Sequence, residues 1–158
     1  MKVKARDIMT PRFYTLSPDM PLPEVIDVFR NADRKEGRRI FGMMVVDEDG
    51  RLSGMLSMYD ILLYMKPKHI HIWGEMEDIE VKGVVENACR RMKTLVAGDL
   101  MTRDVVTIDP DTHLMVILDI MIKKHIRRLP VVEKGTILGI VYISDLFYHL
   151  LERFEGQE

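Results

Sequence analysis

Two matching stretches decide the fold: "GMLSMYD" at Gly54 to Asp60 and "GIVYISD" at Gly139 to Asp145. Each follows an apolar run and leads into another, so each predicts a strand that passes into a helix, with a carboxylate at the junction. The stretches differ at their fourth position, where the first has the small Ser57 and the second has the bulky Tyr142. A repeated junction predicts two related units, and this difference predicts that the two do not bind alike.

The repetition extends over most of the chain. "RDIMTPRFYTLSPDMPL" (Arg6 to Leu22) matches "GDLMTRDVVTIDPDTHL" (Gly98 to Leu114) in its Met-Thr, its later threonine, its Pro-Asp and its final leucine. Further on, "MMVVDEDGRLSGMLSMYDIL" matches "LPVVEKGTILGIVYISDLF". The first copy is longer mainly because of "NADRKEGRR", which predicts an enlarged loop or helix end. Such internal repetition dictates the architecture of a chain.

Both copies predict the same order of elements. A first strand ("FYTL" or "VVTI") is followed by Ser-Pro-Asp or Asp-Pro-Asp, whose oxygens can cap a helix. Two β-rich runs around a turn then predict a hairpin, and a last helix begins near Met58 or Ile143. The first helix of each copy is predicted by apolar residues at helical spacing. These are Leu22, Val25, Ile26 and Phe29, and Leu114, Ile117, Leu118 and Met121.

We therefore expect an α+β fold of two pseudo-symmetric β-α-β-β-α units. A unit this small cannot cover its own sheet, so the two are expected to pack sheet to sheet, with a cleft between them. The predicted boundaries are 1–66 for the first repeat, 67–96 for a connector and 97–158 for the second repeat.

The connector predicts one amphipathic helix, because apolar residues recur at helical spacing from Val81 to Leu95. Cys89, the single cysteine, lies within this pattern, and we expect a small buried side chain rather than a reactive thiol. Upstream, "HIHIW" places His69, His71 and Trp73 on one side of an extended segment. Two histidines so spaced could share a metal ion, but no further ligand is near in sequence, which favours a packing or dimer role.

Composition argues against several classes of function. The 158 residues are 47% hydrophobic and 30% charged, which is typical of a domain with its own core. A formal net charge of −2 provides no overall attraction to nucleic acid or anionic lipid. No apolar stretch approaches the roughly 20 residues of a membrane span, and "MKVKARDIMT" lacks the apolar region of a secretory signal. With its single cysteine, the chain is expected to be cytoplasmic.

In their doubled order, the Met-Thr, "RRLPVV" and Gly-apolar-apolar-x-x-x-Asp elements resemble a tandem cystathionine-β-synthase (CBS) domain pair, or Bateman module. The resemblance covers nearly the whole chain outside Lys66 to about Val96. It implies a non-enzymatic sensor that binds AMP, ADP, ATP or S-adenosylmethionine, with or without Mg²⁺, in clefts between the repeats. It also implies a homodimer that signals to an effector protein by a conformational change. No Walker-type glycine loop or His-Asp-Ser arrangement suggests catalysis.

The resemblance implies a main cleft built on the first junction. There the Asp60 carboxylate would accept hydrogen bonds from ribose hydroxyls, and Arg127 and Arg128 would pair with phosphate oxygens. Structural roles fit the same residues: Ser57 and Asp60 as a helix cap, and the arginines as a solvated strand end. The implied site consists of Met55, Ser57, Asp60, Val106, Arg127, Arg128 and Ser144.

The reciprocal cleft is poorer in polar groups. Tyr142 replaces the hydroxyl residue, and Gly42 stands where the other cleft has Arg128, with Arg38 and Arg39 just upstream. We therefore expect one good nucleotide site and one that is weak, apolar or empty. The second site would consist of Tyr14, Gly42, Ile140, Tyr142 and Asp145.

Two other functions fit the sequence. One is a structural or dimerisation module with degenerate clefts. The other is a nucleic-acid-binding module that uses the basic pairs Arg38-Arg39, Arg90-Arg91 and Arg127-Arg128. The absence of an aromatic stacking platform and of positive net charge argues against nucleic acid.

Overall fold

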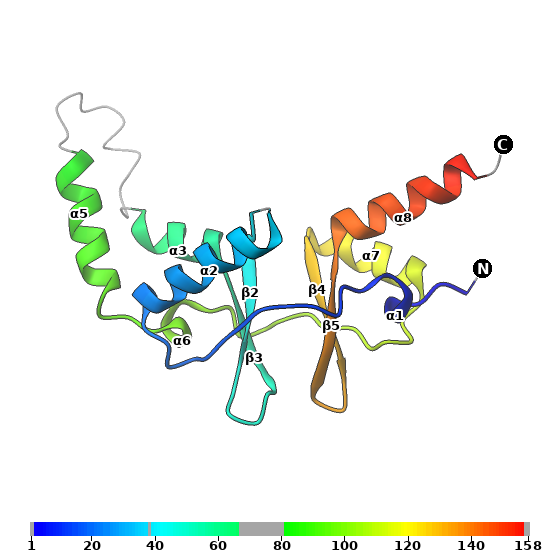
Figure 1. Cartoon of the computed structure of the whole chain (residues 1–158), viewed down its shortest axis with the longest axis horizontal. Helices are drawn as coiled ribbons and strands as arrows, with labels where there is room; N and C mark the ends of the chain where they lie inside the picture. Colours follow the sequence, from blue (N-terminus) through cyan, green and yellow to red (C-terminus); the bar gives the residue numbers. More distant parts are fainter. Residues whose placement is uncertain (1, 38, 67–80, 157–158) are drawn as a thin grey trace. The chain divides into compact units, whose positions relative to one another are not determined.

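The computed structural model describes residues 2–37, 39–66 and 81–156, which fall into two compact units (Figure 1). We call residues 14–48 and 53–104 the first unit, and residues 1–13, 49–52 and 105–158 the second unit. Each unit thus contains the helices and most of the hairpin of one repeat together with the Met-Thr segment of the other. The histidine segment His69 to Trp73 and Arg38 lie outside the described residues.

The first unit is built on a sheet with the order β1-β2-β3, in which β1 runs parallel to β2 with Thr15 opposite Met44. The predicted "FYTL" strand is shortened to its last two residues. The elements of this unit are β1 (Thr15–Leu16), α2 (Leu22–Glu36), β2 (Gly42–Val46), β3 (Leu52–Ser57), α3 (Met58–Met65), α5 (Val81–Met92) and α6 (Ala97–Leu100).

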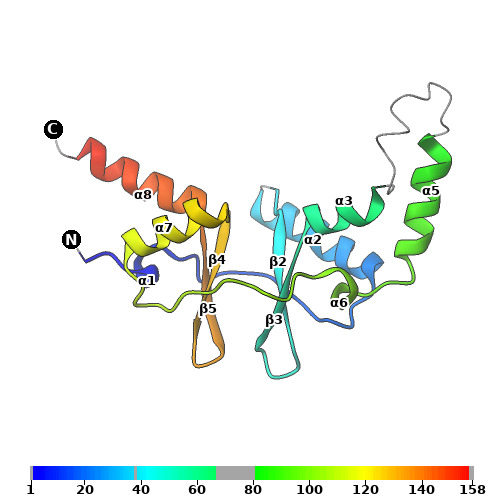
Figure 2. The ribbon, with the colours of Figure 1, turned by 180° about the vertical axis from the view of Figure 1, so that it is seen from behind.

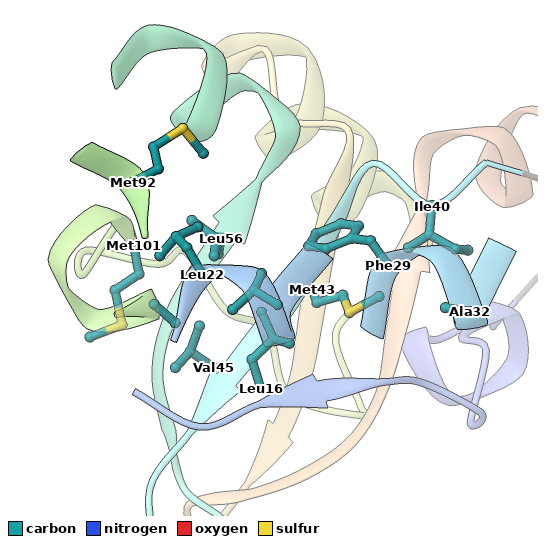
Figure 3. Close-up of a cluster of buried hydrophobic side chains, with 12 residues drawn as sticks. Leu16, Leu22, Phe29, Ala32, Ile40, Met43, Val45, Leu56, Met92 and Met101 are labelled. Atoms are coloured by element: carbon teal, nitrogen blue, oxygen red, sulfur yellow. The ribbon is translucent and has the colours of Figure 1, made fainter. Parts of the chain in front are cut away.

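An apolar cluster holds the first unit together (Figure 3). Leu22, Val25 and Phe29 from α2 are buried in it, as their helical spacing predicts. Met92 and Met101 join the same cluster, so the connector helix α5 and the segment after α6 belong to this unit. The predicted amphipathic helix in the connector is therefore confirmed.

The second unit contains an antiparallel pair of strands and the helices of the second repeat (Figure 2). The hairpin closes through Lys134 and Gly135, which both have positive φ (52° and 82°), as a type I′ turn requires. Val3, Ala5 and Ile8 pack into the same core as Leu129 and Val141. The elements are α1 (Ala5–Ile8), α7 (Leu114–Lys124), β4 (Arg128–Glu133), β5 (Thr136–Tyr142) and α8 (Ile143–Glu155).

The predicted "VVTI" strand of the second copy is wrong in extent. It is reduced to one parallel bridge between Ile108 and Val131, with Ile108 donating to the Pro130 carbonyl at 3.0 Å. Pro130, in the strand that pairs with this segment, has no N–H, so that strand has one backbone donor fewer for a hydrogen bond to the segment.

The predicted helix caps are also wrong. Helix α2 begins after Pro21, and α7 begins after His113, whose Nδ1 accepts from the Met115 amide at 3.0 Å. The oxygens of Ser17 and Asp109 instead accept from amides two residues later, at 3.4 and 2.8 Å. Ser-Pro-Asp and Asp-Pro-Asp therefore form turns that precede the helices.

Cys89 is exposed, so its predicted burial is wrong. The buried side of α5 is formed by Ala88 and Met92, four residues apart. Cys89 follows Ala88, and one residue turns the side chain about 100° around the helix, away from that side. Among the helices that the structure describes, none is long and apolar enough to cross a membrane.

Candidate functional site

The repeated Met-Thr and glycine motifs meet in each unit. In the first unit, Met55 on β3 and Thr102 exchange backbone hydrogen bonds of 2.9 and 2.8 Å. In the second unit, Thr10 and Ile140 on β5 do the same, at 2.8 and 3.0 Å. The Met-Thr segment of one repeat is thus paired with the glycine-motif strand of the other.

The glycines of the two motifs are required by this close approach. A Cβ at Gly54 would lie 2.7 Å from both the Thr102 carbonyl oxygen and the Met101 sulfur. A Cβ at Gly139 would lie 2.7 Å from the Thr10 carbonyl oxygen. Side chains do not tolerate such distances, so both strands need a residue without a side chain where the segment passes.

Asp60 and Ser57 form a capping box at the start of α3. Asp60 Oδ2 accepts from the Ser57 amide at 2.9 Å and from the Ser57 hydroxyl at 3.0 Å, and the Asp60 amide donates to Ser57 Oγ at 3.2 Å. This confirms the structural interpretation of the pair. The other carboxylate oxygen, Oδ1, accepts from the Thr102 hydroxyl at 3.4 Å.

The second junction is built differently. Tyr142 precedes α8, and its side chain does not accept a bond from the amides of the first turn. The half-buried Asp145 accepts from the Thr10 hydroxyl at 3.3 Å through Oδ2. A phenol ring cannot fold back onto the first turn as the short serine side chain does, which explains the missing cap.

The other predicted residues of the main cleft lie in the second unit. Arg128 begins β4 and stands opposite Tyr142 in the hairpin, and the Arg127 carbonyl accepts from the Ile143 amide at 2.8 Å. Ser144 is exposed in the first turn of α8, and Val106 is half-buried. The structure therefore gathers Arg127, Arg128 and Ser144 at one end of the hairpin.

The residues predicted for the second cleft are divided in the same way. Tyr14 and Gly42 belong to the first unit, where the Tyr14 hydroxyl donates to Glu36 Oε1 at 2.7 Å and Gly42 is buried at the start of β2. Ile140, Tyr142 and Asp145 belong to the second unit, at the end of β5 and the start of α8.

The sequence interpretation missed Thr10 and Thr102 as members of the two junctions. Their hydroxyls contact the carboxylates of Asp145 and Asp60. A signal was present, because the Met-Thr dipeptide is repeated as faithfully as the carboxylates are.

A group of charges links the N-terminal segment to the rest of the second unit. Asp111 Oδ1 accepts from Arg6 Nη2 at 2.6 Å and from Lys4 Nζ at 3.4 Å. The two cations lower the pKa of Asp111 below its usual value, and the carboxylate raises the pKa of Arg6. Within the described ranges, no group of three or more His, Cys, Asp or Glu side chains is placed to hold a metal ion.

The CBS domain family model matches the chain at residues 5–67 and 97–152. The uncharacterized protein MJ1426 of Methanocaldococcus jannaschii is 30% identical over 146 residues, which cover 84% of this chain and 83% of that protein.

Solved structures are similar as well. The CBS domain of a CBS domain containing membrane protein from Sphaerobacter thermophilus has a TM-score of 0.70 and 31% identity, covering 93% of this chain and 87% of that one. The cytosolic domain of the Mg²⁺ channel MgtE, solved in complex with ATP, has a TM-score of 0.69 and 25% identity. That match covers 94% of this chain and 49% of the MgtE chain.

Proposed function

The chain belongs to the CBS domain family, and from this premise we propose that it is a regulatory module whose Asp60 junction binds an adenosine nucleotide. The observation that carries the proposal is the position of the half-buried Asp60 carboxylate, where a strand ends and a helix begins. The MgtE domain, which was solved with ATP, supports the class of ligand.

The recognition we propose follows from ordinary hydrogen-bond chemistry. A carboxylate accepts from both hydroxyls of a ribose, and Oδ1 of Asp60 is the oxygen that the capping box does not use. Arg127 and Arg128 would pair with phosphate oxygens, because the planar guanidinium matches two of them at once.

Two smaller roles complete the proposed site. Met55 and Val106 would contact the base, and Ser144 would donate to a phosphate oxygen. Residues 1–66 and 97–158 would act as the two regulatory repeats, with 67–96 as their connector.

The site of Tyr14, Gly42, Ile140, Tyr142 and Asp145 is proposed to be the weaker one. Tyr142 supplies no cap to α8, so the first-turn amides and Asp145 are not organised as they are around Asp60. The buried Gly42 supplies no cation where the main site would have Arg128.

Calorimetric titration with AMP, ADP, ATP and S-adenosylmethionine, with and without Mg²⁺, tests the proposal. Asp60→Asn should weaken binding at least about tenfold, the effect of losing about 1.4 kcal/mol, whereas Asp145→Asn should leave the stronger site intact. Asp99→Asn is the matched control, because Asp99 Oδ2 caps α6 in the same way, accepting from the Val96 amide at 2.9 Å. Equal losses in the variants of Asp60 and Asp145, or a loss only in that of Asp145, would contradict the site assignment.

A second candidate function, a dimerisation module, is favoured by exposed apolar side chains on two helices. Tyr59 on α3 is 72% exposed and Phe154 on α8 is 81% exposed. Leu62 and Leu63 are also exposed on α3, as are Phe147 and Tyr148 on α8. Exposed apolar side chains along a helix are typical of a protein interface, and we propose a second copy of the chain as the partner of each helix.

Sedimentation measurements separate the two functions. Leu62→Glu and Phe147→Glu should convert a dimer to a monomer, and Val85→Glu, an equivalent change on α5, should not. A dimer whose melting temperature no adenosine compound raises would favour the purely structural function, since a ligand of the folded state must raise it.

A further inference from the structure

A groove lies between α2 and α5 within the first unit, and its lining residues do not include those of the Asp60 junction. Its volume is about 290 Å³. Its two walls are held together, because Leu22 and Met92 share one core and the Leu22 amide donates to the Leu95 carbonyl at 3.0 Å (Figure 3). The groove is lined by Leu22, Pro23, Ile26, Asp27, Arg30, Cys89, Met92 and Lys93.

The groove has an apolar floor and a charged rim. Pro23 and Ile26 supply the accessible apolar surface of the floor, since Leu22 and Met92 are buried. The exposed Arg30 and Lys93 contribute two cations. Asp27 is the carboxylate of the lining and lies 3.9 Å from Arg30 Nη1, with both side chains about 70% exposed. An ion pair so long and so exposed is weak, so the rim retains an excess of one positive charge.

Size and charge together define the occupant. A volume of about 290 Å³ equals that of about ten water molecules, which is enough for a small organic ligand. An apolar floor favours a hydrocarbon body, and two cations against one carboxylate favour a single negative charge. We propose that this groove binds a medium-chain carboxylate, with its chain on the floor and its carboxylate paired with Lys93 and Arg30.

Such a ligand would fasten the connector helix to the first repeat. Among the described side chains of α5, Ala88 and Met92 are the buried ones, so the helix is held by a short apolar contact. A chain lying between Ile26 on α2 and Cys89 on α5 would add to it. The site would thus act on the connector, independently of the Asp60 junction.

Cys89 supplies the test, because it is the single cysteine of the chain and lines the groove. The rate of Cys89 alkylation by iodoacetamide, a neutral reagent, is measured by mass spectrometry at increasing octanoate concentration. We expect saturable protection, about tenfold at ten times the dissociation constant. Octan-1-ol, which has the same chain without the charge, should protect much less.

Two variants and a control complete the experiment. Lys93→Met and Arg30→Met should each remove most of the protection by octanoate. Lys123→Met, a change of another exposed lysine, on α7 of the second unit, should leave it intact. No saturable protection, equal protection by the alcohol, or protection in Lys93→Met equal to that in the unmodified protein would each overturn the proposal.

Discussion

The hydroxyl of Thr10 donates a hydrogen bond to the carboxylate of Asp145 across 3.3 Å, although the two residues stand 135 positions apart in the chain. Thr102 and Asp60 repeat the contact at 3.4 Å. Each carboxylate that the family resemblance connects with ribose is therefore in contact with a threonine from the other repeat. A ribose bound to either carboxylate would share it with this hydroxyl.

Replacement of Thr102 by valine, which keeps the shape and removes the hydroxyl, should weaken nucleotide binding at the Asp60 junction. Thr102 orients Oδ1, the oxygen proposed to accept from the ribose. The loss of one long hydrogen bond should lower the free energy of unfolding by about 0.5 to 1 kcal/mol. Thr10→Val is the matched variant and should leave the stronger site unchanged in calorimetry. Unchanged affinity in Thr102→Val would show that the Thr102 hydroxyl does not contribute to nucleotide binding.

Replacement of Gly54 or Gly139 by alanine should destabilise the protein by about 1 to 3 kcal/mol, the usual cost of overpacking. The new methyl group would lie 2.7 Å from the carbonyl oxygen of Thr102 or Thr10. Unfolding in urea measures the change. Gly156→Ala is the control, since a Cβ there lies 3.4 Å from its nearest neighbour. A free energy of unfolding equal to that of the control would mean that the Met-Thr segment moves to accommodate the methyl group at little energetic cost.

The pKa of Asp111 predicts an acid-sensitive contribution to stability. Its folded value is lowered by Arg6 and Lys4, so the contribution is present above the unfolded value of 3.8 and is lost as the pH falls through the lower folded value. Asp111→Asn should therefore make the urea midpoint less dependent on pH over this acid range. Asp104→Asn, an exposed change in the first unit, serves as the control and should keep the original slope.

Local patterns predicted the units well, because their elements depend on neighbours in sequence. The hairpin follows from Lys134-Gly135, and the buried side of α2 follows from the spacing of Leu22, Val25 and Phe29. Such patterns do not predict contacts between segments that are far apart in the sequence. The approach of Thr102 to Asp60 and the shortened strand at Ile108 both depend on which segments meet in space.

The contrast between Ser57 and Tyr142 leads to a prediction in which binding is gained. Tyr142→Ser would place a short hydroxyl before α8, three residues ahead of Asp145, and so recreate the spacing of the Ser57–Asp60 capping box. A new cap should stabilise α8 by about 1 kcal/mol and hold Asp145 as Asp60 is held. Calorimetry should then detect a second, tighter nucleotide site, or a stronger one where binding already occurs. Tyr142→Ala, which removes the ring without adding a cap, is the matched control. If both variants gain binding equally, the ring blocks the site and the cap is irrelevant; if neither does, the hydroxyl position does not distinguish the two junctions.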